Sequence, residues 1–239
     1  MFPAYANETG VGAGIKASGI EREKLFVATK VVGTHGQDIP AALAASLEKL
    51  GVDYLDLYYV HIPWSAHNDE ELQRIWAEME AIKASGKARS IGVSNFEISH
   101  LEAILRTAKT VPAINQIEYH PYRQHEELIK FMRERNIAVA SYSGLSPITA
   151  ARPGPLDDTY AELARKYGVT EADIALRWLL DQDVVVITTS GKEERLQGYL
   201  NTLPTFKLAK EDFKRIAEIG KQKHYKGMGE EFMRRAYCS

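Results

Sequence analysis

Cysteine is almost missing from this chain of 239 residues, since Cys238 is the only one. A single cysteine rules out a framework of intrachain disulfides and a metal site built from cysteine thiolates. Long hydrophobic runs are also missing, and none is long enough to cross a bilayer as a helix. The opening segment Met1–Ala4 is too short and too uncharged for a signal peptide. These absences predict a reducing compartment, with the cytoplasm as the expected location.

Charge of one sign is not in excess either, because 30 Lys and Arg stand against 32 Asp and Glu, a formal net charge of −2. This balance gives no reason to expect nucleic acid or a membrane as a partner. Hydrophobic residues (45%) and charged residues (26%) are present in ordinary amounts. At this length the chain can bury a large core. We expect one domain over residues 1–239, with 221–239 as a C-terminal tail or lid.

Short apolar runs alternate with longer amphipathic stretches along the chain. The short runs are nearly all apolar and rich in β-branched or aromatic residues, as strands covered on both faces should be. We expect strands at Leu25–Val31, Tyr54–His61, Ser90–Val93, Ala113–Tyr119, Ala138–Tyr142 and Val184–Thr188. Helices are expected at Ile39–Leu50, Asp69–Ser85, Ile98–Ala108, His125–Arg135, Thr159–Tyr167 and Glu171–Asp181. The expected N-cap residues are Asp69, Thr159 and Thr170.

Strands that alternate with helices predict an α/β fold with a parallel sheet. An open doubly wound sheet and a (β/α)8 barrel of the TIM type both fit this alternation. The dinucleotide-binding form of the open sheet is disfavoured, because no Gly-x-Gly-x-x-Gly follows an early strand. Polar residues at many strand ends favour the barrel, whose site is built at the carboxyl ends of its strands. With six strands, the expected barrel is incomplete and lacks the first strand, the first helix and most of the second strand.

Three polar residues stand at the ends of such elements. Lys30 ends the first expected strand, His61 ends the second, and Tyr5 precedes an expected helix. Gathered at one rim, a lysine, a tyrosine and a histidine could move a proton onto a carbonyl oxygen. Taken singly, each also has an ordinary explanation as a packing tyrosine, a solvated lysine or a structural histidine.

Several segments together resemble the aldo-keto reductase family, with the fungal members as the nearest in character. The resemblance runs from Ala4 to about Leu208, and its most specific part is the Gly86–Phe96 run. The matching segments are Ala4–Glu8, Thr29–Val31, Leu55–His61, Gly86–Phe96, Asn115–Tyr122 and Ser141–Leu145. The resemblance implies a TIM-type barrel that reduces an aldehyde or ketone, the small-molecule substrate, with a nicotinamide cofactor.

The resemblance also implies roles for the three polar residues. Tyr5 matches the tyrosine that donates the proton. A phenol has a pKa near 10, and a neighbouring ammonium lowers it; Lys30 matches the lysine with that effect. His61 matches the histidine that orients and polarises the substrate carbonyl. No metal is implied.

Further matched positions imply contacts to the nicotinamide. Ser94, Asn95 and Gln116 match residues that hydrogen-bond its carboxamide, a group that needs donors and acceptors alike. Tyr142, with Ser143 beside it, matches the aromatic residue that stacks under the ring. Without the resemblance these residues would be read as turn formers and packing residues at strand ends.

The last strand leads into a loop and helix start that bind the adenosine phosphates in the family, since free amides at a helix N-terminus favour anions. Ser190 and Arg195 match this loop, and Lys192 adds positive charge. Many relatives have a lysine where Thr189 stands, and that lysine meets the 2′-phosphate of NADPH. We expect NADPH rather than NADH as the cofactor, with Lys192 and Arg195 supplying the charge.

The sequence departs from the family at its start. The family has an aspartate five residues before the tyrosine, which here would be position 0. A missing first strand would leave two barrel edges unpaired, so self-association is expected to compete with the monomer that is usual in the family. Two alternatives therefore stay open. One is a truncated, catalytically impaired relative that only binds nucleotide or a protein, and the other is an unrelated (β/α)8 enzyme, such as an isomerase using His61 and Glu118.

Overall fold

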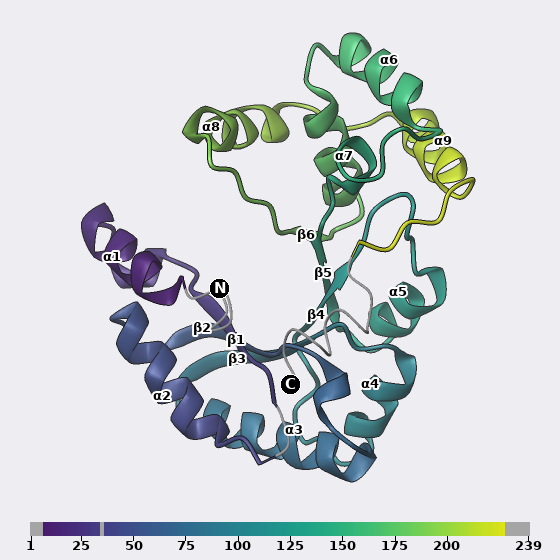
Figure 1. Cartoon of the computed structure of the whole chain (residues 1–239). Coiled ribbons are helices and arrows are strands. Elements are labelled where there is room, and N and C mark those ends of the chain that lie inside the picture. The colour runs from purple at the N-terminus through teal and green to yellow at the C-terminus, as the bar shows by residue number, and fades with distance from the viewer. Residues whose placement is uncertain (1–6, 34–35, 228–239) are drawn as a thin grey trace. The chain divides into compact units, whose positions relative to one another are not determined.

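A computed structural model of the chain describes residues 7–33 and 36–227 (Figure 1). All six predicted strands are present, and they follow one another in a single sheet in chain order. The pairs β1–β2, β2–β3 and β5–β6 are parallel. This confirms the predicted α/β class. The strands are β1 (Ala28–Val31), β2 (Leu55–Val60), β3 (Ala88–Ser94), β4 (Ile114–Glu118), β5 (Ala138–Tyr142) and β6 (Val185–Val186).

Helices fill the intervals between the strands. The α-helices are α1 (Glu8–Ser18), α2 (Ile39–Leu50), α3 (Asp69–Ala84), α4 (Ile98–Leu105), α5 (Glu126–Arg133), α6 (Asp157–Tyr167), α7 (Glu171–Leu180), α8 (Glu193–Thr202) and α9 (Lys210–Gly220). Short 3-10 helices are η2 (Arg22–Lys24), η3 (Pro63–Ser65), η4 (Ser146–Ile148) and η5 (Leu203–Thr205). No helix among residues 7–33 and 36–227 is both long enough and apolar enough to cross a membrane.

The described residues group into two compact units. The first holds them up to Asn115 together with Glu134–Ile137, and the second holds the remainder from Gln116 onward. The chain passes from the first unit to the second within β4. The prediction of a single domain over residues 1–239 stays a prediction.

In the first unit, strand β2 is buried along its whole length between β1 and β3. Helices α2 and α3 pack on one face of these strands (Figure 1). The apolar face predicted for α3 is present, because Leu72, Ile75, Trp76, Met79 and Ile82 are all buried. Burial of such a face is the main source of stability for a helix of this kind.

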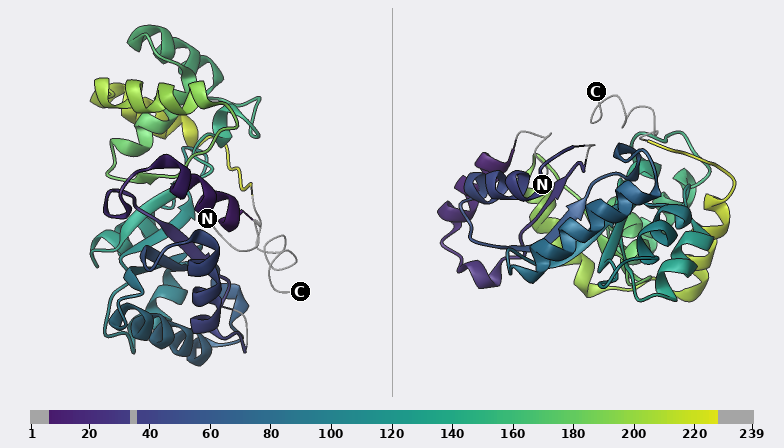
Figure 2. Two further views of the ribbon diagram at one scale, coloured as in Figure 1. Left: turned by 90° about the vertical axis from the view of Figure 1, so that its left-hand side faces the viewer. Right: turned by 90° about the horizontal axis from the view of Figure 1, so that it is seen from below.

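Helix α1 lies beside α2 (Figure 2), but it brings almost no apolar surface to the core. Its only buried residue is Glu8. Gly12 brings the two backbones together: a Cβ placed there would lie 2.5 Å from the carbonyl oxygen of Lys49. The absence of a side chain at position 12 therefore permits the close approach of α1 to α2.

The second unit has its core around Trp178 of α7. The Trp178 ring stacks on Phe213 of α9 with 5.7 Å between ring centres, and it lies 5.6 Å from the ring of Tyr119. Ala140 and Ser141 of β5 pair with Val185 and Val186 of β6.

Some predicted boundaries differ from the structure. The N-cap of α3 is Asn68 rather than Asp69, and its side chain accepts a hydrogen bond from the backbone of Glu71. Helix α6 begins at Asp157, so Thr159 is not its N-cap. The N-cap prediction for Thr170 is confirmed, because its hydroxyl accepts from the backbone of Asp173. Strand β6 is shorter than the predicted Val184–Thr188, since only two of its residues pair with β5.

Candidate active site

The predicted site residues are distributed over both units. Tyr5, the predicted proton donor, lies outside the described residues. In the first unit are Lys30, His61, Ser94 and Asn95. In the second are Gln116, Tyr142, Ser143, Ser190, Lys192 and Arg195.

Lys30 is a buried lysine on the short strand β1. Its residue is 7% exposed, and it stands opposite Tyr59 of β2 in the strand register. The ammonium lies 5.5 Å from the centre of the Tyr59 ring, an attractive placement for a cation over a π-face. Burial lowers the pKa of Lys30 from 10.5 to about 8, because the apolar surroundings disfavour the charged form. Lys30 therefore loses its proton at a lower pH than a solvated lysine does.

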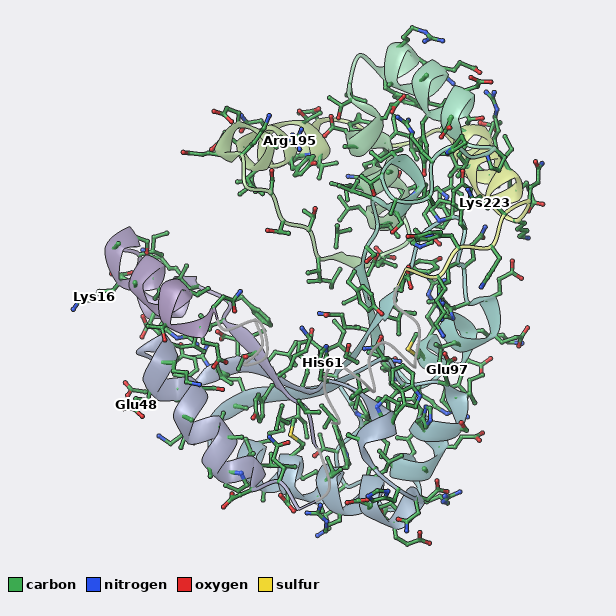
Figure 3. The ribbon with its side chains drawn as sticks, in the orientation of Figure 1. Lys16, Glu48, His61, Glu97, Arg195 and Lys223 are labelled. Atoms are coloured by element: carbon green, nitrogen blue, oxygen red, sulfur yellow. The ribbon has the colours of Figure 1, made fainter. Side chains whose placement is uncertain are left out.

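His61 directly follows β2 and is 3% exposed. Its backbone N–H donates to the carbonyl of Val31 at 2.8 Å, which ties the end of β2 to the end of β1. Figure 3 shows it at the end of the strand, on the face of the sheet away from α3. Burial and the positive charge of Lys30 lower the pKa of His61 to about 3. The imidazole is therefore neutral at physiological pH.

The loop after β3 brings two further predicted residues next to His61. The Asn95 side-chain amide donates to the carbonyl of His61 at 3.0 Å and to the hydroxyl of Ser94 at 3.1 Å. Asn95 has a φ of 63°, a left-handed conformation that asparagine adopts more readily than most residues. Ser94, Asn95 and His61 thus form one connected group at the carboxyl ends of β2 and β3.

Asn115 of β4 supports this loop, and sequence reasoning did not assign it a role. Its side chain is fully buried, donates to the carbonyl of Phe96 at 2.8 Å and accepts from the Phe96 N–H at 3.4 Å. Asn115 therefore holds the backbone of Phe96, the residue after Asn95, through both its N–H and its carbonyl. Asn115 is one of three polar residues in the five-residue strand β4, all of them buried, and no local pattern in the sequence separates its role from theirs.

In the second unit, Gln116 lies in β4 and Tyr142 ends β5, the next strand of the sheet. Gln116 is buried and Tyr142 is half-buried. The Ser141 hydroxyl donates to the carbonyl of Tyr119 at 2.6 Å and links the ends of these strands. Ser143 has a φ of 57°, which turns the chain sharply after Tyr142 into η4.

A buried ionic group lies two residues beyond Gln116. Glu118 contacts Nε2 of His120 at 3.2 Å through Oε1, the atom that also accepts from the backbone N–H of Gly227 at 2.8 Å. Arg123 lies 3.8 Å from its other oxygen. Burial alone would raise the pKa of Glu118, but the hydrogen bonds from His120 and Gly227 outweigh it and lower that pKa. The sequence identified Glu118 without its partners.

The loop before α8 holds the three residues matched to phosphate binding. The Ser190 hydroxyl accepts from the backbone N–H of Lys192 at 3.0 Å, and Lys192 caps α8 without a side-chain hydrogen bond. Lys192 and Arg195 are both exposed. Arg195 lines a cavity of about 500 Å³ between α8, α7 and η4, together with Leu145 and Tyr199. Of the three, the structure brings only Arg195 to this cavity.

The parallel sheet carries a buried lysine and a buried histidine near the carboxyl ends of neighbouring strands, the edge at which α/β barrels build their sites. The sequence profile of the Aldo/keto reductase family matches residues 2–221. The chain belongs to this family of oxidoreductases, which confirms the resemblance found in the sequence.

Known relatives agree with this membership. The chain is 39% identical over 224 residues to the NAD/NADP-dependent indole-3-acetaldehyde reductase of Schizosaccharomyces pombe, covering 92% of this chain and 78% of the relative. It is 37% identical to the glyoxal reductase of Bacillus subtilis, covering 91% and 76%. The crystal structure of a Bombyx mori aldo-keto reductase in complex with NADP superimposes with a TM-score of 0.87 at 31% identity, covering 98% and 80%.

Proposed function

We propose that the chain reduces an aldehyde or ketone to an alcohol, with NADPH as the source of hydride and Tyr5 as the proton donor. The observation that carries this proposal is the pair of buried basic residues at neighbouring strand ends, Lys30 and His61. Buried titratable groups with displaced pKa values are characteristic of active sites. The names of the relatives, aldehyde and glyoxal reductases among them, support a carbonyl substrate.

Lys30 has the properties needed to assist a phenol. With a pKa of about 8 it still carries its proton for most of the time near pH 7. A buried ammonium acts through a low dielectric and lowers the pKa of a neighbouring phenol more than a solvated one does. In the proposed reaction the phenol of Tyr5 gives its proton to the carbonyl oxygen, and Lys30 stabilises the phenolate that remains.

His61 has the properties needed to hold the substrate. Because its pKa is about 3, the imidazole is neutral throughout the physiological range. A neutral imidazole with one N–H donates a hydrogen bond to a carbonyl oxygen without competing with Tyr5 as an acid. The carbonyl of His61 is fixed by Asn95 and its N–H by Val31, so its backbone is held in place from two sides.

Each unit offers groups suited to part of a nicotinamide dinucleotide. In the first unit Ser94 and Asn95, at the end of β3, have the hydroxyl and amide groups that a carboxamide requires, and in the second unit the amide of Gln116 on β4 is of the same kind. The half-buried ring of Tyr142, with Ser143 beside it, offers an aromatic face for stacking. When bound, the cofactor supplies the hydride that reaches the carbonyl carbon.

The choice of NADPH rests on charge at the start of α8. Lys192 and Arg195 are exposed there, and Ser190 lies in the same loop. Cationic side chains near a helix N-terminus provide a site for a phosphate group. We therefore assign Ser190, Lys192 and Arg195 to the phosphates, with NADH as the weaker cofactor.

The test is turnover of a reactive aldehyde such as a nitrobenzaldehyde, followed by the loss of NADPH absorbance. We expect steady turnover in the wild-type chain and a large loss in Tyr5→Phe, which keeps the ring and removes the hydroxyl. No turnover above the Tyr5→Phe variant would overturn the proposal. Titration with NADPH, followed by fluorescence quenching, would then decide whether the chain binds the nucleotide alone.

A further inference from the structure

Glu8 is a buried carboxylate for which the proposed mechanism has no use. It is 2% exposed and is the one residue of α1 that is buried. Burying a carboxylate costs several kcal/mol unless the group gains good partners. The larger apolar residues of α1, Val11 and Ile15, are only half-buried, so the one fully buried side chain of this helix is a carboxylate.

Glu8 is hydrogen-bonded to Thr29 of β1. The Thr29 hydroxyl, which is fully buried, donates to Oε1 of Glu8 at 2.7 Å. Thr29 stands opposite Tyr58 of β2, whose fully buried ring carries a hydroxyl close enough for the charge of Glu8 to act on it. Burial and, after it, the negative charge of Glu8 raise the pKa of Tyr58. Glu8, Thr29 and Tyr58 thus form a polar cluster between α1 and the sheet.

This cluster lies next to Lys30 in the chain and on the other face of β1. Successive side chains of a strand point to opposite faces, so Thr29 turns to Glu8 while Lys30 turns the other way. Strand β1 has only four residues, and among the described residues it pairs with β2 alone. A short strand at the end of a sheet is free to fray unless something holds it from outside.

We infer that Glu8 is a positioning residue: through its hydrogen bond to Thr29 it holds β1 in place and so keeps the ammonium of Lys30 buried. This rests on the proposed function for its catalytic consequence, because only there does the burial of Lys30 matter to the reaction. Glu8 itself touches no reacting group in this assignment. A glutamine at position 8 keeps the acceptor oxygen and is expected to replace it.

The first experiment measures the titration of Lys30 itself, in the absence of any cofactor. The protein is labelled with 13C-lysine, and the Lys30 resonance is identified by its loss in Lys30→Arg. In the wild type, burial gives Lys30 a pKa of about 8. We expect the same value in Glu8→Gln. In Glu8→Ala and in Thr29→Val, which keeps the shape of the side chain but removes its hydroxyl, we expect the pKa to rise toward 10.5 as β1 loosens and Lys30 is hydrated.

Thr9→Ala is the matched control, because Thr9 is exposed on the same turn of α1. A purely structural role for Glu8 would lower the melting temperature of Glu8→Ala and leave the titration of Lys30 where it was. A Lys30 pKa that stays near 8 in Thr29→Val, or in a folded Glu8→Ala, would overturn the inference. Circular dichroism identifies a variant that does not fold, and Thr29→Val then decides alone.

The second experiment is kinetic. If the chain reduces carbonyls, Glu8→Ala and Thr29→Val are expected to lower kcat about ten- to a hundredfold, the loss typical of a displaced catalytic group, with KM for NADPH nearly unchanged. Glu8→Gln should restore kcat. Absence of turnover in the wild type would count against the proposed function only, because the titration of Lys30 tests Glu8 without any reaction.

Discussion

The carboxylate of Glu118 accepts a hydrogen bond from the backbone N–H of Gly227, a residue 109 positions later in the chain, with 2.8 Å between Oε1 and N. The same late segment is held a second time by Lys223, whose ammonium donates to the carbonyls of Ala151 and Pro153 at 2.6 and 2.8 Å. The segment from Lys223 to Gly227 is therefore a strap fixed at both of its ends.

We expect Glu118→Ala to release the C-terminal end of the strap. Removal of the carboxylate takes away the acceptor of the N–H of Gly227, which is an exposed residue. Loss of this one hydrogen bond costs about 0.5–1.5 kcal/mol of unfolding free energy. Hydrogen exchange read by mass spectrometry should show faster exchange over 221–227, and urea unfolding should show the loss of stability. Glu118→Gln keeps an acceptor oxygen and is the control. Unchanged exchange of the strap in Glu118→Ala would contradict the role of Glu118 as its anchor.

The same contact predicts a response to acid. Since the pKa of Glu118 is lower in the folded chain than its ordinary value of 4.5, its charge stabilises the fold above that value. The stabilisation is lost as the pH falls through the folded pKa. Exchange over 221–227 should therefore accelerate in acid in the wild type and depend less on pH in Glu118→Gln. An equal response to acid in both proteins would show that other groups control the strap.

The buried charge of Lys30 is expected to lower the free energy of unfolding at neutral pH. Its pKa is about 8 when folded and 10.5 when unfolded, so the folded chain penalises its charge below pH 8, and the penalty disappears as the pH rises to 10.5. At about 1.4 kcal/mol per unit, the penalty is on the order of 3 kcal/mol near pH 7. Lys30→Met should thus be more stable than the wild type at pH 7, by an amount that shrinks toward pH 10.5, while turnover is lost.

Urea unfolding of Lys30→Met at pH 7 and at pH 10 measures this difference. Lys16→Met is the control, because Lys16 is exposed on α1 (Figure 3) and its charge is solvated. A Lys30→Met variant that is less stable than the wild type at pH 7 would show that Lys30 makes favourable contacts that outweigh its desolvation.

Arg195→Ala is expected to weaken the binding of NADPH more than that of NADH. Loss of one charge-assisted contact to a phosphate, about 1.5–3 kcal/mol, corresponds to roughly a ten- to hundredfold rise in KM. The turnover number kcat should stay close to the wild-type value, since the proposed proton transfer uses Tyr5, Lys30 and His61 and assigns Arg195 only to a phosphate. Lys207→Ala removes an exposed charge elsewhere in the same unit and is the control. An equal rise in KM for both cofactors would contradict the assignment of Arg195 to the 2′-phosphate.

Phe26 marks a surface on which copies of the chain are expected to associate. It is 74% exposed and lies just before β1, which has β2 as its one strand partner among the described residues. A strand with a single described partner, next to an exposed apolar side chain, favours pairing with a second chain. Light scattering at rising protein concentration should show self-association that Phe26→Lys reduces. Val111→Lys, at another exposed apolar residue (46%), should leave it unchanged, and a wild type that stays monomeric would refute the expectation.

The strands were predictable because a strand covered on both faces leaves a visible run of apolar residues. Leu55–Val60 is buried at every position, and the sequence placed it to within one residue at each end. Val185–Val186 was predicted too long, since pairing with β5 ends after two residues while the apolar run continues to Ile187. An apolar run in the sequence predicts which residues are buried. It does not predict how many of them pair with the neighbouring strand.

Side-chain partners across the fold were beyond prediction from the sequence. Lys30 and His61 could be predicted as site residues because they end apolar runs. The hydrogen bond from Thr29 to Glu8 could not, because it joins residues 21 positions apart and leaves no local pattern in the sequence. The N-cap of α3 shows the same limit at short range. Asn68 and Asp69 are both residues that commonly cap helices. The structure has Asn68 in the extended conformation of an N-cap, and the helix begins at Asp69.

The way in which α1 is attached has a consequence for how its sequence can change. The helix meets α2 through the bare backbone at Gly12 and the sheet through Glu8, while the rest of its side chains are not buried. Over evolutionary time its outward residues are therefore free to drift with little effect on the sheet. A single added methyl group at position 12, however, would push the helix away from Lys49. Tolerance to substitution along α1 should accordingly be high at its exposed positions and low at Glu8 and Gly12.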